Sequence, residues 1–217
     1  RQMCIRDSHY FKHLGVSDGL SQVCIPSIYQ DELGAVWLGT TEGLNRYNGK
    51  DVKVFQPSES NHGLTNNEIN ELCGDKNGRM YIRSGNDLIK LDIYTEQFTC
   101  LRQKGVYGLF CKKDTLWVSC ADGIYYYTGQ GTELTFFARV QKGFVGRALY
   151  VDKETVWVVT RKYLVAISRE DPLRQEILLT LDKGNCILGD SSGNIWVGAW
   201  NGLYRISPNR ETTAYVS

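Results

Sequence analysis

The sequence predicts an all-β fold, and within that class a β-propeller, on three observations. Aromatic anchors in apolar segments recur at separations of 44, 36, 40 and 39 residues, at Trp37, Tyr81, Trp117, Trp157 and Trp196. The residue three positions after each anchor is always small, and the residue seven positions after it is always Leu or Ile. Each anchor segment is apolar on both faces, so both faces must be covered. Units of about forty residues that stack face to face around an axis form a propeller, whereas unrelated hairpins in a sandwich would not keep these offsets.

The first unit shows how four strands arise from one repeat. A strand over 24–30 contains Pro26, which cannot donate to a ladder, so this strand should be innermost with one free edge. The turn 31–34 has glycine at its end and leads into the buried strand 35–39. A third strand over 44–47 is followed by Asn48-Gly49, a strong two-residue hairpin signal, and by a fourth strand over 52–55.

The same pattern divides the rest of the chain. We predict five blades over about 19–56, 63–99, 105–138, 145–180 and 184–217. The expected strands after the first blade cover 69–73, 80–82, 88–91, 97–99, 116–118, 123–127, 134–137, 149–151, 156–160, 164–167, 176–179, 196–198, 202–206 and 213–216. Residues 9–14 are expected to be the outer strand of a final blade that is missing.

Residues 1–8 are not expected to belong to the fold. Arg1-Gln-Met-Cys-Ile-Arg-Asp-Ser8 resembles the in-frame translation of a transposase sequencing adapter, so we exclude it from the fold. Cys4 then carries no meaning, and the native N-terminus with any secretion signal is expected to be missing.

Bulk composition excludes several functions. The net charge is +1 with both signs interspersed, so nothing favours nucleic acid or an acidic membrane surface. The sequence contains no run of eighteen apolar residues, which is the length that a membrane-spanning helix needs. Attachment to a membrane would therefore need a transmembrane helix outside this chain. The seven cysteines include no Cys-x-x-Cys pair, and the three histidines are scattered along the sequence. We therefore predict no metal site and no cofactor, and we expect most of the cysteines to be buried and unpaired.

The repeated acidic and aromatic residues are interpreted as structural. Asp31, Asp75, Asp152 and Asp190 precede turns, where a carboxylate bonds nearby backbone amides rather than calcium. The tryptophan anchors lie in doubly apolar strands and are expected to form the core between blades rather than platforms for sugars. We therefore predict no catalytic residue.

Binding residues are expected in loops that depart from the repeat. Propeller ligands usually lie on the face that carries the turns between second and third strands and the loops between blades, here 40–42, 83–87, 119–122, 160–162 and 199–201. Departures from the pattern there give the candidate ligand-binding residues Arg83, Asn86, Arg161, Lys162, Trp200 and Asn201. Arginine can hold carboxylate or sulfate and tryptophan can stack on a sugar ring, although ordinary solvated loops would also contain such residues.

The segment from Gly19-Leu-Ser21 through Asp31, Gly34 and Trp37-Leu-Gly-Thr40 to Gly43-Leu-Asn-Arg-Tyr47 resembles the two-component regulator propeller repeat. Tyr10 to Ser21 resembles the start of the sensor region of hybrid two-component systems. The resemblance covers residue 9 to the end and implies a seven-bladed periplasmic propeller, a homodimer in the full-length protein and a histidine kinase outside this chain. Five blades would then form an open arc whose exposed apolar faces associate.

Three functions follow as hypotheses. The first is a ligand sensor that responds to glycan-derived oligosaccharides. The second is a platform for protein interaction or dimerisation. The third is a lyase or hydrolase, which would need a histidine or paired carboxylates converging on one face.

Overall fold

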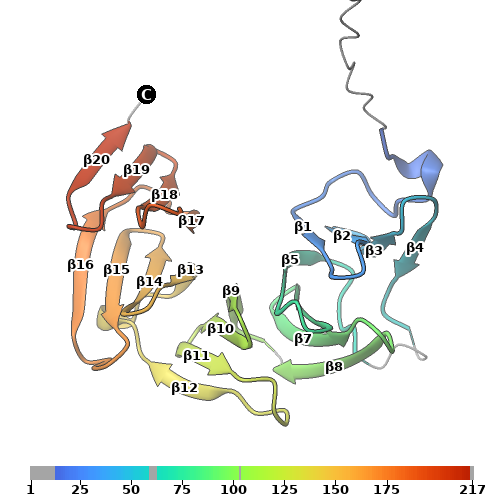
Figure 1. The fold of residues 1–217 in the computed structure, drawn as a ribbon, viewed down its shortest axis with the longest axis horizontal. Coiled ribbons are helices and arrows are strands. Elements are labelled where there is room, and N and C mark those ends of the chain that lie inside the picture. Colours follow the sequence, from blue (N-terminus) through green and yellow to red (C-terminus); the bar gives the residue numbers. More distant parts are fainter. Residues whose placement is uncertain (1–12, 59–62, 103, 216–217) are drawn as a thin grey trace, which may run out of the picture.

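The computed structural model describes residues 13–58, 63–102 and 104–215, which form five four-stranded antiparallel sheets (Figure 1). We number them blades 1 to 5 in chain order. Blade 1 holds β1 (Ser27–Gln30), β2 (Val36–Thr40), β3 (Gly43–Tyr47) and β4 (Val52–Phe55), and blade 2 holds β5 (Ile69–Gly74), β6 (Arg79–Ser84), β7 (Asp87–Asp92) and β8 (Gln97–Arg102). Blade 3 holds β9 (Val106–Lys112), β10 (Thr115–Cys120), β11 (Gly123–Tyr127) and β12 (Thr135–Ala138). Blade 4 holds β13 (Gly146–Val151), β14 (Thr155–Thr160), β15 (Tyr163–Ser168) and β16 (Gln175–Thr180), and blade 5 holds β17 (Cys186–Gly189), β18 (Ile195–Ala199), β19 (Gly202–Ile206) and β20 (Thr212–Tyr215). Two short 3-10 turns, η1 (Val16–Asp18) and η2 (Gln141–Gly143), complete the described elements.

The blades are arranged around a common axis. Within each blade every strand pairs with the next one along the chain. The first strands of successive blades contact one another near the axis, and the fourth strands lie at the periphery (Figure 1). The blades form an arc that is open between blade 5 and blade 1 (Figure 1). The predicted all-β propeller with five four-stranded blades is therefore confirmed.

The hydrophobic core lies between neighbouring blades. Four clusters of buried side chains each join residues of two successive blades, and four of the five anchors, Trp37, Tyr81, Trp117 and Trp157, each belong to one of these clusters. These four anchors therefore pack in the core between blades. Trp196 differs because it is only half-buried and belongs to none of the four clusters, since no described element covers that face of blade 5.

The turn aspartates are structural, as predicted. One oxygen of Asp190 accepts hydrogen bonds from the backbone amides of Ser192 and Asn194, and the other accepts from the Asn194 side chain and from Nε1 of Trp196 at 2.9 Å. The Trp196 and Asn194 bonds hold the pKa of Asp190 at about 2, below its ordinary value. These contacts stabilise the turn and orient the anchor in the strand that follows.

Some predicted details are wrong. Pro26 precedes β1 instead of lying inside it, because the strand starts only where backbone amides can pair. His13 and Leu14 lie in no strand, and the rest of the predicted strand over 9–14, like segment 1–8, falls outside the described residues. Cys24 and Cys186 are exposed, against the expected burial, whereas Cys120 is buried.

The meander gives the arc two faces. Turns between second and third strands, and the segments that connect successive blades, lie at one end of the strands, which we call the upper face. Turns between first and second strands and between third and fourth strands lie at the other end, the lower face. No helix among the described residues is long and apolar enough to cross a membrane.

Candidate functional site

A cleft opens on the upper face over blades 3, 4 and 5. One lobe of about 490 Å³ is lined by Arg147, Arg161, Lys183, Gly184, Asn185, Cys186, Gly198, Ala199 and Trp200. A second lobe of about 360 Å³ is lined by Tyr107, Gly143, Phe144, Val145, Arg147, Thr160, Arg161 and Lys162. Arg147 and Arg161 line both lobes, so we treat the two as one site and call it the upper cleft.

The turn between β14 and β15 places Arg161 and Lys162. Oγ1 of Thr160 accepts hydrogen bonds from the backbone amides of Lys162 and Tyr163 at 3.2 and 2.9 Å, which closes the turn. The carbonyl of Arg161 also accepts the amide of Gly184 from the segment that leads into blade 5. The backbone beneath these cations is therefore fixed while both side chains remain exposed.

Trp200 stands at the other wall of the upper cleft. Its backbone amide donates to the carbonyl of Asp182 at 2.8 Å, but its side chain is 78% exposed. Nζ of Lys183 lies 4.7 Å from the centre of the Trp200 ring. A large aromatic ring held by its backbone and left open to solvent is suited to stack against a flat apolar surface such as a sugar ring.

A β-bulge directs Arg147 into the upper cleft. Gly146 pairs with Thr160 and Ala148 pairs with Val159, so Arg147 is an extra residue in β13 with no partner in the ladder. Such bulges redirect a side chain next to a site. Tyr107, which also lines the cleft, is the equivalent extra residue at the start of β9.

The upper cleft is electropositive. Its lining contains the cations Arg147, Arg161, Lys162 and Lys183, and no carboxylate occurs among the lining residues that the structure describes. Within the described chain, Arg147, Arg161 and Lys162 form no ion pair. Such unpaired guanidinium and ammonium groups are available to bind carboxylate or sulfate.

The structure brings together only part of the predicted set. Arg161, Lys162 and Trp200 line the upper cleft. Asn201 lies beside it, but its side chain accepts the amide of Asp182 at 3.2 Å and donates to the Tyr204 hydroxyl at 2.7 Å. Asn201 thus also has a structural role.

Arg83 and Asn86 lie in blade 2, away from the upper cleft. Nε of Arg83 is 3.4 Å from Oε2 of Glu71, and this carboxylate also accepts the amide of Leu109 in blade 3 at 3.1 Å. Burial raises the pKa of Glu71 to about 7, although Arg83 and the Leu109 amide oppose this shift. The glycine at the position equivalent to Arg83, Gly39 in blade 1, packs against Ile69 of the next blade, whereas Arg83 contacts Glu71 and the carbonyl of Gly85 within blade 2.

Sequence reasoning did not find Arg147, Lys183 or Tyr107. Arg147 and Tyr107 depend on bulges, which alter the register without any marked sequence motif. Lys183 lies in the segment that connects blades 4 and 5, and residues of such segments cannot be aligned between the copies of the repeat.

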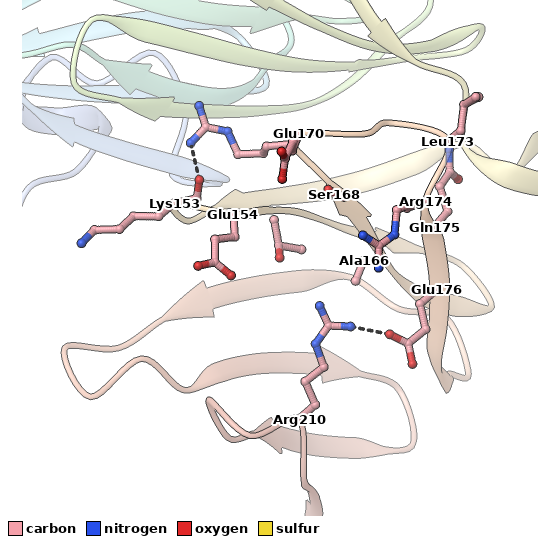
Figure 2. A pocket seen from close by; sticks show the side chains of 12 residues that line it. Lys153, Glu154, Ala166, Ser168, Glu170, Leu173, Arg174, Gln175, Glu176 and Arg210 are labelled. Atoms are coloured by element: carbon pink, nitrogen blue, oxygen red, sulfur yellow. Dashed lines mark hydrogen bonds and ion pairs between the residues drawn. The ribbon is translucent and has the colours of Figure 1, made fainter.

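A larger cleft of about 760 Å³ opens on the lower face between blades 4 and 5. Figure 2 shows Arg210 directed toward Glu176, with which it forms an ion pair. Arg169 donates to the carbonyls of Asp152 and Lys153 at 3.0 Å each. Two of the four cations in this lining, Arg169 and Arg210, are therefore engaged by the protein, and the lining also contains the carboxylates Glu154, Glu170 and Glu176, which makes this cleft the weaker candidate for an acidic ligand despite its volume.

Metal ligands do not converge at either cleft. The described part of the chain contains no group of three His, Cys, Asp or Glu side chains that could hold a metal ion.

Five four-stranded blades around an axis define a β-propeller domain, which here has clefts on both faces. A family model described as the two component regulator propeller matches residues 19–42, so the predicted resemblance is confirmed for the first repeat. Over 46 residues the chain is 41% identical to histidine kinase P4 of Formosa agariphila, a match that covers 21% of this chain and 3% of that kinase.

Solved structures share the fold at low identity. The extracellular domain described as that of the hybrid two component system BT3049 from B. thetaiotaomicron superposes with a TM-score of 0.82 and 23% identity, over 94% of this chain and 32% of that one. Streptogramin B lyase superposes with a TM-score of 0.70 and 17% identity, over 91% of this chain and 70% of the lyase. The chain thus spans about a third of the length of that extracellular domain.

Proposed function

We propose that this propeller is the ligand-sensing part of a hybrid two-component sensor, located in the periplasm. It would respond to a glycan-derived oligosaccharide and signal to a histidine kinase that belongs to the full-length protein. The regulator propeller repeat in blade 1 and the resemblance to extracellular domains of two-component systems support this assignment.

The observation that carries the ligand proposal is the juxtaposition of Trp200 and Arg161 in one cleft. A sugar ring would stack on the exposed indole, while a carboxylate or sulfate substituent would accept hydrogen bonds from the guanidinium. The absence of carboxylates from the described lining favours an acidic oligosaccharide over a neutral one.

Calorimetric titration with matched oligosaccharides tests the proposal. Pairs that share a backbone but differ in carboxylation or sulfation separate stacking from charge recognition. We expect binding of the acidic member to be at least about tenfold tighter and to weaken as salt is raised. Equal affinity for both members would remove the charge assignment, and no binding of any oligosaccharide would count against the sensor proposal.

A role in self-association is a second candidate, favoured by the uncovered face of blade 5. Leu188, Leu203 and Tyr215 on this face are 64%, 42% and 48% exposed. Tyr150, Leu164 and Leu179 occupy the equivalent positions of blade 4, where they pack in the core shared with blade 5. The face of blade 5 therefore has the character of a blade interface, and a second copy of the protein is the partner that we propose for it.

An enzymatic role has less support. A lyase resembles the chain in fold, but the lining of the upper cleft offers no histidine or carboxylate within the described residues. Incubation of the protein with the same oligosaccharides, followed by analysis of chain length, would reveal cleavage if it occurs.

A further inference from the structure

Cys73 and Cys111 lie on the innermost strands of neighbouring blades. Cys73 belongs to β5 and pairs with the anchor Tyr81, whereas Cys111 belongs to β9 and pairs with Leu116. The two strands contact each other, and both cysteines pack as half-buried residues against the hydrophobic cluster that joins blades 2 and 3.

The register of the two strands places these cysteines opposite each other. The side-chain carboxylate of Glu71 in β5 accepts a hydrogen bond from the backbone amide of Leu109 in β9 at 3.1 Å, so Glu71 and Leu109 lie at about the same level of the two strands. Both strands run from the upper to the lower face, and side chains two positions apart in a strand point to the same side. Cys73 lies two residues after Glu71 in β5, and Cys111 lies two residues after Leu109 in β9. Both pairs are separated by 38 residues in the sequence, so the two cysteines face each other one two-residue repeat further along the strands.

Equivalent contacts at other blade interfaces show the same approach. Tyr29 in blade 1 and Tyr150 in blade 4 are opposite their anchors, as Cys73 is in blade 2. A Cβ atom added to Gly74 would overlap the Tyr29 side chain, and one added to Gly189 would overlap that of Tyr150.

Cys111 occupies the position of these two glycines. Gly74, Gly189 and Cys111 each directly follow the residue opposite the anchor of their own blade. At the other two interfaces a tyrosine packs against a glycine. At the interface between blades 2 and 3, Cys73 takes the position of the tyrosine and Cys111 takes that of the glycine. The neighbouring Cys111 thiol and burial together raise the pKa of Cys73 well above its ordinary value.

We propose that Cys73 and Cys111 form a reversible dithiol–disulfide pair that cross-links the inner strands of blades 2 and 3. Glutathione disulfide serves as the oxidant. The thiolate of one cysteine attacks a sulfur of glutathione disulfide, which gives a mixed disulfide and releases one glutathione thiolate. The second cysteine attacks the protein sulfur of the mixed disulfide and releases the second glutathione, so two electrons and two protons pass from the cysteines to one glutathione disulfide.

The other described cysteines provide controls. Cys100 in β8 and Cys120 in β10 are at least half-buried. None of the groups that shift the pKa of either thiol is another cysteine. Cys24 and Cys186 are exposed and can form disulfides between molecules, which a non-reducing gel separates from a cross-link within one chain. Because the raised pKa of Cys73 lowers its thiolate fraction, oxidation should proceed faster at pH 8.5 than at pH 7.

Peptide mapping of the full chain tests the proposal. The protein is treated with glutathione disulfide at about pH 8.5, its remaining thiols are blocked with N-ethylmaleimide, and it is digested and analysed by mass spectrometry without reduction. We expect a peptide that joins Cys73 to Cys111 in monomeric protein, and we expect dithiothreitol to remove this link. Cys111→Ser should abolish the linked peptide, whereas Cys100→Ser should retain it.

A second readout keeps the test valid if one variant folds poorly. Closing a loop of 38 residues should raise the melting temperature of the oxidised wild type above that of the reduced form. This difference should persist in Cys100→Ser and vanish in Cys73→Ser and Cys111→Ser. A map in which Cys73 and Cys111 carry only separate maleimide or glutathione adducts, or are linked to other cysteines, would overturn the proposal.

Discussion

Nε1 of Trp37 donates a 2.7 Å hydrogen bond to Oδ2 of Asp31. The other oxygen of Asp31 accepts the backbone amides of Leu33 and Ala35 at 3.0 and 2.9 Å. One carboxylate thus closes the turn and orients the anchor that packs between blades. The same bond joins Asp152 to Trp157 at 2.6 Å and Asp190 to Trp196 at 2.9 Å, so it is a repeated element of the fold.

Substitution of Asp31 should therefore destabilise the protein. We expect Asp31→Ala to lower the free energy of unfolding by about 2–3 kcal/mol, because it leaves buried donors without an acceptor. Asp190→Ala is the matched control, since Trp196 is half-buried and the donors that lose the Asp190 carboxylate regain water; its loss of stability should be clearly smaller. Urea unfolding measures both, and equal losses would show that burial of the bond is irrelevant.

The anchors and turns could be predicted from the sequence because they recur. Five copies reveal which positions are structural, and the role of Trp37 in the core follows from apolar residues on both faces of its strand. The hydrogen bond from Trp37 to Asp31 was not predicted. The repeat identifies which residues recur, but it does not identify the hydrogen-bond partner of each polar atom. Two buried groups that a turn brings together are found only when the side chains are placed.

The candidate site was less predictable than the fold. Trp200 and Arg161 stood out because they depart from the repeat, and the structure places both in the upper cleft. Arg83 departs from the repeat equally but lies against Glu71. Arg147 was missed because a bulge, a property of strand pairing, directs it into the cleft.

Glu71 should make stability depend on pH near neutrality. Burial raises its pKa from the ordinary 4.5 to about 7, so the folded protein binds this proton more tightly than the unfolded chain does. Its contribution is fully present below pH 4.5 and is lost as pH rises through about 7. Because 30% of the side chain remains exposed, we expect a loss on the order of 1 kcal/mol.

Glu71→Gln tests this dependence because it keeps the shape of the side chain and removes the titration. Unfolding free energies of wild type and variant should diverge between pH 5 and pH 8, with wild type losing more stability than the variant. Parallel curves across this range would contradict the assignment.

Ligand binding should depend on Arg161 and not on Arg83. We expect Arg161→Ala to weaken the binding of an acidic oligosaccharide by about 1.5–3 kcal/mol, the range for hydrogen bonds to charged groups. Arg83→Ala is the control, because Arg83 lies two blades away and contacts Glu71. Calorimetry on both variants decides, and a loss confined to Arg83→Ala would move the site to blade 2.

Self-association should depend on the uncovered face of blade 5. Leu188→Lys places a charge within this face and should shift sedimentation toward the monomer. Leu173→Lys is the control, since Leu173 is 92% exposed in the turn between β15 and β16 of blade 4, outside the uncovered face of blade 5. If wild type is monomeric at the concentrations tested, or if both variants behave alike, blade 5 is not the association surface.

A crystal structure of the protein with the tightest-binding acidic oligosaccharide tests the central claim most directly. We predict a sugar ring stacked on Trp200, with its carboxylate or sulfate within hydrogen-bond distance of Arg161 or Arg147. Ligand bound instead in the lower cleft beside Arg210 and Glu176, or at a site on another blade, would contradict the assignment of the upper cleft as the sensing site.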